Sequence, residues 1–220
     1  SIISSSKVIE HFFKDFKELY GDRITSNPVK FPGFRDAIEQ ALDNGVTPCG
    51  VVTGLGTFIC EEDVETVKGK KSSIKKQKTS YQVGLVVSNV EFQAGAFDMA
   101  SCEKVCRLLD DCARLKLPVI FFISSAGMQT KEGGGSLFSM AIINERITRF
   151  VKDLDLPVLC FGFRDCTGGA QASFVTHLLV RTNSICRSVG CRKPFARTFN
   201  FIKLPLYKCR YNGWSCKKSI

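Results

Sequence analysis

The sequence predicts an α/β fold in which parallel strands are covered by helices. Two continuous apolar runs, PVIFFIS at 118–124 and PVLCFGF at 157–163, are typical of strands that are buried on both faces. Each run is followed by a turn rich in small residues and then by a segment whose apolar residues have helical spacing. This repeat of strand, glycine-bearing turn and helix favours a layered α/β architecture.

Further elements follow from the spacing of apolar residues and from the positions of glycine and proline. Helical spacing occurs over 7–20 and over 34–42, and the second stretch ends at Asn44-Gly45. Residues 46–60 and 81–92 are predicted to be extended. The remaining predicted elements are helices over 99–117, 137–154 and 170–179.

Residues 61–80 differ in composition from the predicted strands on either side. Four acidic residues come first, and six lysines follow between Lys68 and Lys78 with almost no apolar residue among them. We interpret this segment as a solvated loop between two strands. An alternative interpretation makes the lysines a basic lip that meets a phosphorylated ligand.

The charge of the chain is unevenly distributed. The net charge of +10 comes from 31 basic and 21 acidic residues, and the excess lies in residues 181–220, which hold ten basic residues and no acid. A neutral remainder argues against a cationic surface that tracks a phosphate backbone. No apolar run reaches the roughly 18 residues of a membrane span. We therefore expect a helical lead-in over 1–27, an α/β domain over 28–180 and a basic tail of uncertain structure over 181–220.

Eleven cysteines are present, and no two of them form a CxxC motif. Cys102, Cys106 and Cys112 fall within one predicted helix, where a buried thiol packs as a small apolar residue. We therefore predict reduced, structural cysteines rather than a disulfide framework or a metal site. Reduced thiols favour a reducing compartment, the cytoplasm, and the first six residues lack the apolar region of a signal peptide.

Candidate chemistry lies in the turns that follow the two buried strands. The first turn contains Ser124-Ser125-Ala126-Gly127-Met128-Gln129, and the second contains Asp165-Cys166-Thr167-Gly168-Gly169-Ala170. Ligands of open α/β sheets bind beyond the carboxyl ends of the strands, where small residues let a substrate approach the backbone. Two such turns side by side are able to aim N–H donors at one developing oxyanion. The alternative is that both are tight turns that need glycine only for its dihedral angles.

The sequence lacks the motifs of other common catalytic and phosphate-binding sites. There is no GxSxG elbow and no GxxxxGK[ST] loop, and the two histidines, His11 and His177, are interpreted as structural. Glu132 and Asp165 flank the two turns. Each is a candidate acid or base, although a helix cap or an ion pair is the commoner role for such a residue.

Five motifs in order resemble one known family. Residues 28–180 are similar to the beta-type carboxyltransferase of acetyl-CoA carboxylase and, more broadly, to biotin-dependent acyl-CoA carboxyltransferases. The motifs that carry the resemblance are NPVKFPGF at 27–34, VVTGLG at 51–56, FQAGA at 92–96 with Glu103-Lys104 after it, SSAGMQ at 124–129, and DCTGGAQASF at 165–174.

The resemblance implies a crotonase-like (ClpP/crotonase) fold, a superhelix of repeated ββα units, incomplete at the C-terminal end. It implies transfer of a carboxyl group from carboxybiotin to an acyl-CoA, with malonyl-CoA for fatty acid biosynthesis as the expected product. The backbone N–H groups of the two turns would then form the oxyanion holes, and the turn after residue 92 would bind the CoA substrate. The expected catalytic residues are Ala126, Gly127, Gly168, Gly169 and Ala170, and the expected CoA-binding residues are Gly95 and Ala96.

The family also implies partners. These are an alpha-type carboxyltransferase half, a biotin carboxyl carrier protein and a biotin carboxylase, in a hetero- or homo-oligomer. This sequence supplies no four-cysteine zinc ribbon, and Ala126 stands where the family usually has glycine. After His177 the similarity fades, as a reading-frame shift or a foreign end would produce.

Two further functions stay open. Residues 181–220 combine six aromatic residues with ten basic ones, a composition that suits stacking and phosphate contact in a nucleic-acid-binding module. The third hypothesis is a non-catalytic scaffold with a crotonase-like fold.

Overall fold

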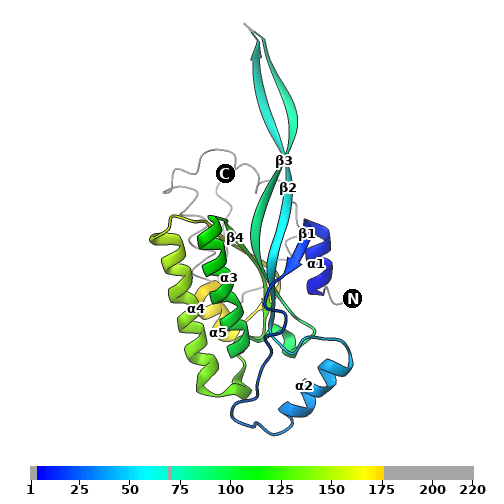
Figure 1. The fold of residues 1–220 in the computed structure, drawn as a ribbon, viewed down its shortest axis with the longest axis vertical. Coiled ribbons are helices and arrows are strands. Elements are labelled where there is room, and N and C mark those ends of the chain that lie inside the picture. The colour runs from blue at the N-terminus through cyan, green and yellow to red at the C-terminus, as the bar shows by residue number, and fades with distance from the viewer. Residues whose placement is uncertain (1–3, 69–70, 176–220) are drawn as a thin grey trace, which may run out of the picture.

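A five-stranded mixed sheet forms the centre of the molecule (Figure 1). The computed structural model describes residues 4–68 and 71–175, so His177 and the basic tail lie outside the described residues. The strand order is β1-β2-β3-β4-β5, with β1 to β3 antiparallel and β3 to β5 parallel. The strands are β1 (Phe13–Glu18), β2 (Val51–Lys68), β3 (Lys71–Ser88), β4 (Val119–Ser125) and β5 (Val158–Cys166).

Helices lie on both faces of this sheet. One face carries α3 (Met99–Leu115) and α4 (Gly134–Lys152), and the other carries α1 (Ser5–Phe12). The described residues also form α2 (Phe34–Asp43), and β5 is followed by α5 (Gly168–Ala170) and a π-helical turn, Gln171–Val175. The predicted α/β architecture is confirmed, because each buried run forms a parallel strand followed by a helix.

The sequence of β4 shows why this sheet is buried on both faces. All seven of its residues are buried. Val119, Phe121 and Ile123 pack with the residues of α3 and α4, whereas Ile120 and Phe122 pack with Val8 and Ile9 of α1. Successive side chains of a strand point to opposite faces, so an uninterrupted apolar run supplies both cores.

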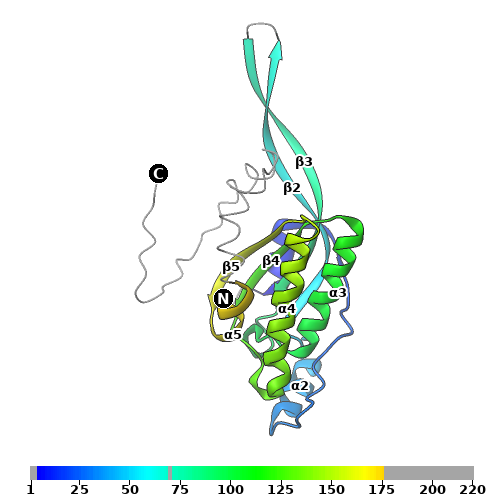
Figure 2. The same cartoon turned by 90° about the vertical axis from the view of Figure 1, so that its left-hand side faces the viewer.

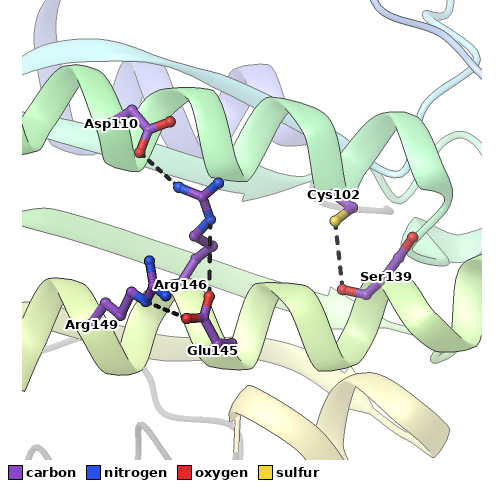
Figure 3. Close-up of polar contacts among 6 residues, drawn as sticks. All are labelled: Cys102, Asp110, Ser139, Glu145, Arg146 and Arg149. Atoms are coloured by element: carbon purple, nitrogen blue, oxygen red, sulfur yellow. Dashed lines mark hydrogen bonds and ion pairs between the residues drawn. The ribbon is translucent and has the colours of Figure 1, made fainter.

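Helices α3 and α4 lie side by side (Figures 2 and 3). Their facing residues are apolar and buried, and a polar rim runs along the contact. At this rim, Arg146 Nη1 donates to Asp110 Oδ1 at 3.1 Å, whereas inside the contact the buried Cys102 Sγ donates to the Ser139 carbonyl at 3.5 Å. Glu145 forms an ion pair with Arg149 on the same helix.

The predicted structural role of the cysteines agrees with their burial. Cys49, Cys102, Cys112 and Cys160 are buried, reduced thiols. Burial raises the pKa of Cys49 and of Cys112 to about 12. These two thiols therefore stay protonated and pack as small apolar groups.

The prediction of one helix over 7–20 is wrong in its second half. Helix α1 ends at Phe12, and Phe13 begins β1, which pairs antiparallel with β2 through Phe13↔Phe58 and Glu18↔Gly54. By pairing with β2, β1 satisfies backbone groups that β2 would otherwise expose at the edge of the sheet. The N-terminal lead-in is thus part helix and part strand, and the division of the chain at residues 27 and 180 stays a prediction.

The prediction of a loop over 61–80 is also wrong. Strands β2 and β3 pair without interruption from Val51↔Ser88 to Lys68↔Lys71 and form a long hairpin (Figures 1 and 2). The register sets acidic positions of β2 opposite lysine positions of β3, as in Glu61↔Lys78 and Asp63↔Lys76. Opposite charges at paired positions favour antiparallel strands, so a charged segment without apolar periodicity is still able to form a ribbon.

The other predicted elements occur with small shifts at their ends. The helix predicted over 170–179 begins at Gly168 and becomes π-helical after Ala170, and its last predicted residues lie outside the described part of the chain. Within the described ranges, every helix is too short or too polar to cross a lipid bilayer.

Candidate functional site

The two glycine turns lie against each other at the carboxyl ends of β4 and β5. The Thr167 N–H donates to the Ser125 carbonyl at 2.9 Å, and Ser125 is in register with Cys166. A Cβ atom on Gly127 would lie 3.0 Å from the nitrogen of Gly169. The structure therefore brings the predicted turn residues together from segments about 40 residues apart in the chain.

A hollow of about 400 Å³ opens beside these turns. Its volume is within the range of sites that bind small molecules. The lining residues come from the turn after β3 and from the ends of β4 and β5: Val90, Ala94, Ser124, Ser125, Ala126, Asp165 and Thr167. Of the predicted site residues, Ala126 lines the hollow directly.

A ladder of hydrogen bonds supports the first turn from one side. The Ala126 N–H donates to the Ala94 carbonyl at 3.1 Å, the Phe97 N–H to the Gly127 carbonyl at 2.8 Å, and the Gln129 N–H to the Phe97 carbonyl at 2.7 Å. Residues 94–99 thus run beside residues 124–129. We call residues 94–99 the support segment.

Gly95 and Ala96 belong to this support segment, and both are buried. Gly95 has a φ of +67°, and a Cβ atom there would lie 2.5 Å from the Ser124 carbonyl oxygen. Its own carbonyl accepts a hydrogen bond of 2.7 Å from Ser125 Oγ. Neither residue is among those that line the hollow, whereas the adjacent Ala94 is. Their predicted CoA contact stays a prediction, and the structure shows them beneath the first turn.

The N–H groups of the two turns differ in their partners. In the first turn, Ala126 donates to the Ala94 carbonyl, and Gly127 donates to Ser125 Oγ at 3.1 Å. In the second turn, Thr167 precedes α5 and makes no side-chain capping bond to it. The first N–H groups of a helix have no acceptor within the helix, so Gly168 and Gly169 present donors that the described side chains do not cap.

Glu132 and Asp165 have different environments. Glu132 is 2% exposed and accepts hydrogen bonds from Thr25 Oγ1 and from the Met99 N–H at the start of α3. Burial raises its pKa, and the nearby carboxylate of Asp98 adds to the shift. Asp165 lines the hollow, and its carbonyl accepts a hydrogen bond of 3.2 Å from Ser124 Oγ. Glu132 is thus placed as a helix cap, and Asp165 lies nearer to the site.

The sequence prediction omitted three polar residues of the hollow, namely Ser124, Ser125 and Thr167. Ser125 is 2% exposed, and its hydroxyl joins the Gly95 carbonyl to the Gly127 N–H. The signal was present, because hydroxyl residues at the carboxyl ends of two parallel strands face the ligand edge of a sheet. His11 lies on α1 against Phe12 and is not among the lining residues.

Comparison with curated proteins finds beta subunits of the acetyl-coenzyme A carboxylase carboxyl transferase among the relatives of this chain. The chain is 31% identical over 163 residues to acetyl-coenzyme A carboxylase carboxyl transferase subunit beta 1 of Lachnospira eligens, which covers 74% of this chain and 55% of the relative. The beta subunit of Clostridium kluyveri is 29% identical over 73% of this chain and 48% of that protein. That of Clostridium botulinum is 26% identical over 90% of this chain and 62% of its own length. The chain therefore spans about half the length of the curated relatives it matches.

The fold has a counterpart among solved structures. Transcarboxylase 12S, solved with hydrolysed methylmalonyl-coenzyme A bound, superposes with a TM-score of 0.56 at 19% identity over 76% of this chain and 27% of its own. No protein-family model matches the chain. Over about three quarters of its length, this chain is thus a homologue of the beta-type carboxyltransferase subunits of acetyl-CoA carboxylase, and its fold is that of the crotonase-like carboxyltransferases.

Proposed function

We propose that this chain is the CoA-binding, beta-type part of a biotin-dependent acyl-CoA carboxyltransferase, with acetyl-CoA as its substrate. The observation that carries the proposal is the contact of the two glycine turns beside a hollow at the carboxyl ends of β4 and β5. The names of the curated relatives support the substrate, and the fold of transcarboxylase 12S supports the architecture.

The reaction requires negative charge on the thioester oxygen to be stabilised. Breaking the Cα–H bond of an acyl thioester gives an enolate, whose oxygen needs preorganised donors. We assign this donor role to the backbone N–H groups of Gly168 and Gly169, which directly follow the lining residue Thr167. Ala170 was expected to donate too, but it is fully buried. Ala126 and Gly127 were expected to donate as well, but their N–H groups are bonded inside the protein. We therefore propose that Ala126 shapes the wall of the hollow and that Gly127 allows the two turns to approach each other.

The small residues and hydroxyls at the hollow fit carboxybiotin, the carboxyl donor that the family uses. Carboxybiotin, carried by a partner protein, would supply the carboxyl group and afterwards the base that takes the Cα proton. In this chain, Ser124 and Thr167 offer hydroxyls at the hollow, and Ala94 and Ala126 leave room for a bulky substrate. Positioning also contributes to the rate, because two reactants held in the right geometry react as if they were parts of one molecule.

The proposal includes partners and a location. An alpha-type half would complete the site, and a biotin carboxyl carrier protein and a biotin carboxylase would deliver the carboxyl group in an oligomeric complex. The cytoplasm suits the reduced, buried cysteines. The basic lip, in contrast, is not part of the proposal, because the β2–β3 hairpin extends from the end of the sheet opposite the hollow.

The test pairs two substitutions at one residue. Gly169→Pro removes the N–H donor, and the fixed φ of proline suits the first turn of a helix. Gly169→Ala keeps the donor, and its Cβ would meet Met128 Cβ at an ordinary 3.5 Å. Mixed with an alpha-type half, the chain should move the carboxyl group of malonyl-CoA to free biotin. The kcat of the Pro variant should be about 100-fold lower, and that of the Ala variant should fall far less.

Two results would contradict the proposal. One is the absence of carboxyl transfer by the folded wild-type chain with every alpha-type half tried. The other is a wild-type rate in a Gly169→Pro variant whose circular dichroism and melting temperature are unchanged, which would remove the donor role from this residue.

A further inference from the structure

A buried carboxylate joins three separate parts of the chain. Glu132 Oε1 accepts a hydrogen bond of 2.5 Å from Thr25 Oγ1, and Glu132 Oε2 accepts one of 2.6 Å from the Met99 N–H. Thr25 is 3% exposed, and its own N–H donates to the Pro48 carbonyl at 2.9 Å. Glu132 therefore connects the segment after β1 to the start of α3 and to the single helical turn Thr130–Glu132.

The two segments that meet at Glu132 are those of the site. Met99 ends the support segment, and Glu132 lies three residues beyond Gln129. Starting from the hollow, the bonds that N–H groups make between the two segments are Ala126 to Ala94, Phe97 to Gly127, Gln129 to Phe97 and Met99 to Glu132. The Glu132 bond is thus the end of the ladder that is farthest from the hollow.

A plain helix cap does not account for the whole arrangement. Helix α3 already has a cap, because Asp98 Oδ1 accepts from the Ser101 N–H at 2.6 Å and Oδ2 accepts from the Gly50 N–H at 2.9 Å. A second buried carboxylate at the same helix start carries a desolvation cost that its two donors must offset. Glu132 adds a connection between the support segment and residues 130–132, which follow the first turn.

We propose that Glu132 is a positioning residue for the Ala126–Gly127 turn, and that Thr25 acts with it. By fixing residues 130–132 to the start of α3, Glu132 sets the separation of the support segment from the first turn. Its effect on chemistry passes through the contact of Gly127 with Gly169. The assignment to catalysis rests on the carboxyltransferase function proposed above, whereas the effect on the turn does not.

Three variants and one control test this role. Glu132→Ala removes both acceptors, Glu132→Gln keeps one carbonyl oxygen and supplies an N–H for Thr25, and Thr25→Val removes the hydroxyl. The matched control is Thr53→Val, because Thr53 is fully buried and its hydroxyl donates to the Leu19 carbonyl at 2.8 Å, outside the ladder.

The expected result is a separation of kcat from KM. With an alpha-type half present, Glu132→Ala should lower kcat about tenfold or more and change the KM for acyl-CoA less than about twofold, because a misplaced turn weakens stabilisation of the transition state. Glu132→Gln should restore most of the loss. Thr25→Val should lower kcat in the wild type but not in the Glu132→Ala background, because both residues act through one bond.

A second measurement does not depend on carboxyl transfer. The amides of Phe97 and Gln129 are part of the ladder. Their hydrogen exchange in the full chain should be faster in Glu132→Ala and unchanged in Thr53→Val. If the wild type transfers no carboxyl group but this exchange pattern appears, the proposed function fails and the positioning role stands. The role is overturned if exchange is unaffected, or if Glu132→Ala lowers kcat no more than Thr53→Val does.

Discussion

Gly127 and Gly169 lie so close that a Cβ atom on Gly127 would approach the Gly169 nitrogen to 3.0 Å. Gly127 also has a φ of +110°, which residues with a side chain rarely adopt. A side chain at position 127 would therefore strain the backbone and separate the two turns.

Gly127→Ala should therefore destabilise the protein, whereas Gly169→Ala should not. We expect the first substitution to lower the free energy of unfolding by about 1–3 kcal/mol, the usual cost of such backbone strain. At position 169 the new Cβ would meet Met128 Cβ at 3.5 Å, an ordinary contact. Urea unfolding of both variants measures the difference, and equal midpoints would contradict the prediction.

Gly84 and Cys112 should be coupled in stability. A Cβ atom on Gly84 of β3 would lie 2.4 Å from Cys112 Sγ, and Cys112 is fully buried on α3. Gly84→Ala alone should cost about 1–3 kcal/mol through overpacking. Adding Cys112→Ala frees the space, so the double variant should lose less stability than the two single losses combined. Urea unfolding of all four proteins gives the coupling energy, and strict additivity would count against this packing.

The sequence predicted the layered fold and the pairing of the two turns because both depend on local patterns. The apolar run of β4 is long enough to indicate burial on both faces, and glycine marks the turns that follow β4 and β5. The junction of α1 and β1 was missed because Phe12, Phe13 and Phe16 also match helical spacing. Only pairing with Phe58, a residue distant in the sequence, makes Phe13 the start of a strand.

The site was predicted less completely than the fold. Backbone donors and acceptors have no sequence signature, so the bond from the Ala126 N–H to the Ala94 carbonyl was not foreseen. The link between Thr25 and Glu132 spans 107 positions, and no local pattern announces it. Long-range hydrogen bonds of this kind decide which turn N–H groups are left for a substrate.

The buried Glu132 should make stability depend on pH. Its pKa is raised above the ordinary value of 4.5, chiefly by burial and further by Asp98. The folded state then binds a proton more tightly than the unfolded state does. The contribution of Glu132 to the free energy of unfolding is therefore fully present below its ordinary pKa and is lost as pH rises through the raised pKa.

Glu132→Gln should reduce this decline, because glutamine does not titrate. Some dependence should remain, since burial also raises the pKa of Asp98. The measurement is urea unfolding of wild type and variant at half-unit steps from pH 4 upward. Curves that run parallel across the whole range would show that Glu132 does not contribute.

Removal of the outer β2–β3 hairpin should leave CoA binding intact. Cys60 and Thr79 are paired in the hairpin, so replacing residues 61–78 by Asn-Gly keeps the register and supplies a favoured two-residue turn. The hollow lies at the carboxyl ends of the strands, and Lys78 is ten residues of β3 before Ser88, or about 30 Å along the strand. These lysines are therefore too distant to contact a ligand in the hollow.

Titration calorimetry with CoA should give the same Kd for the truncated and the full chain within about twofold, an energy difference below 0.5 kcal/mol. A tenfold weaker Kd in a truncated chain that keeps its melting temperature would instead bring the hairpin lysines back into the binding site.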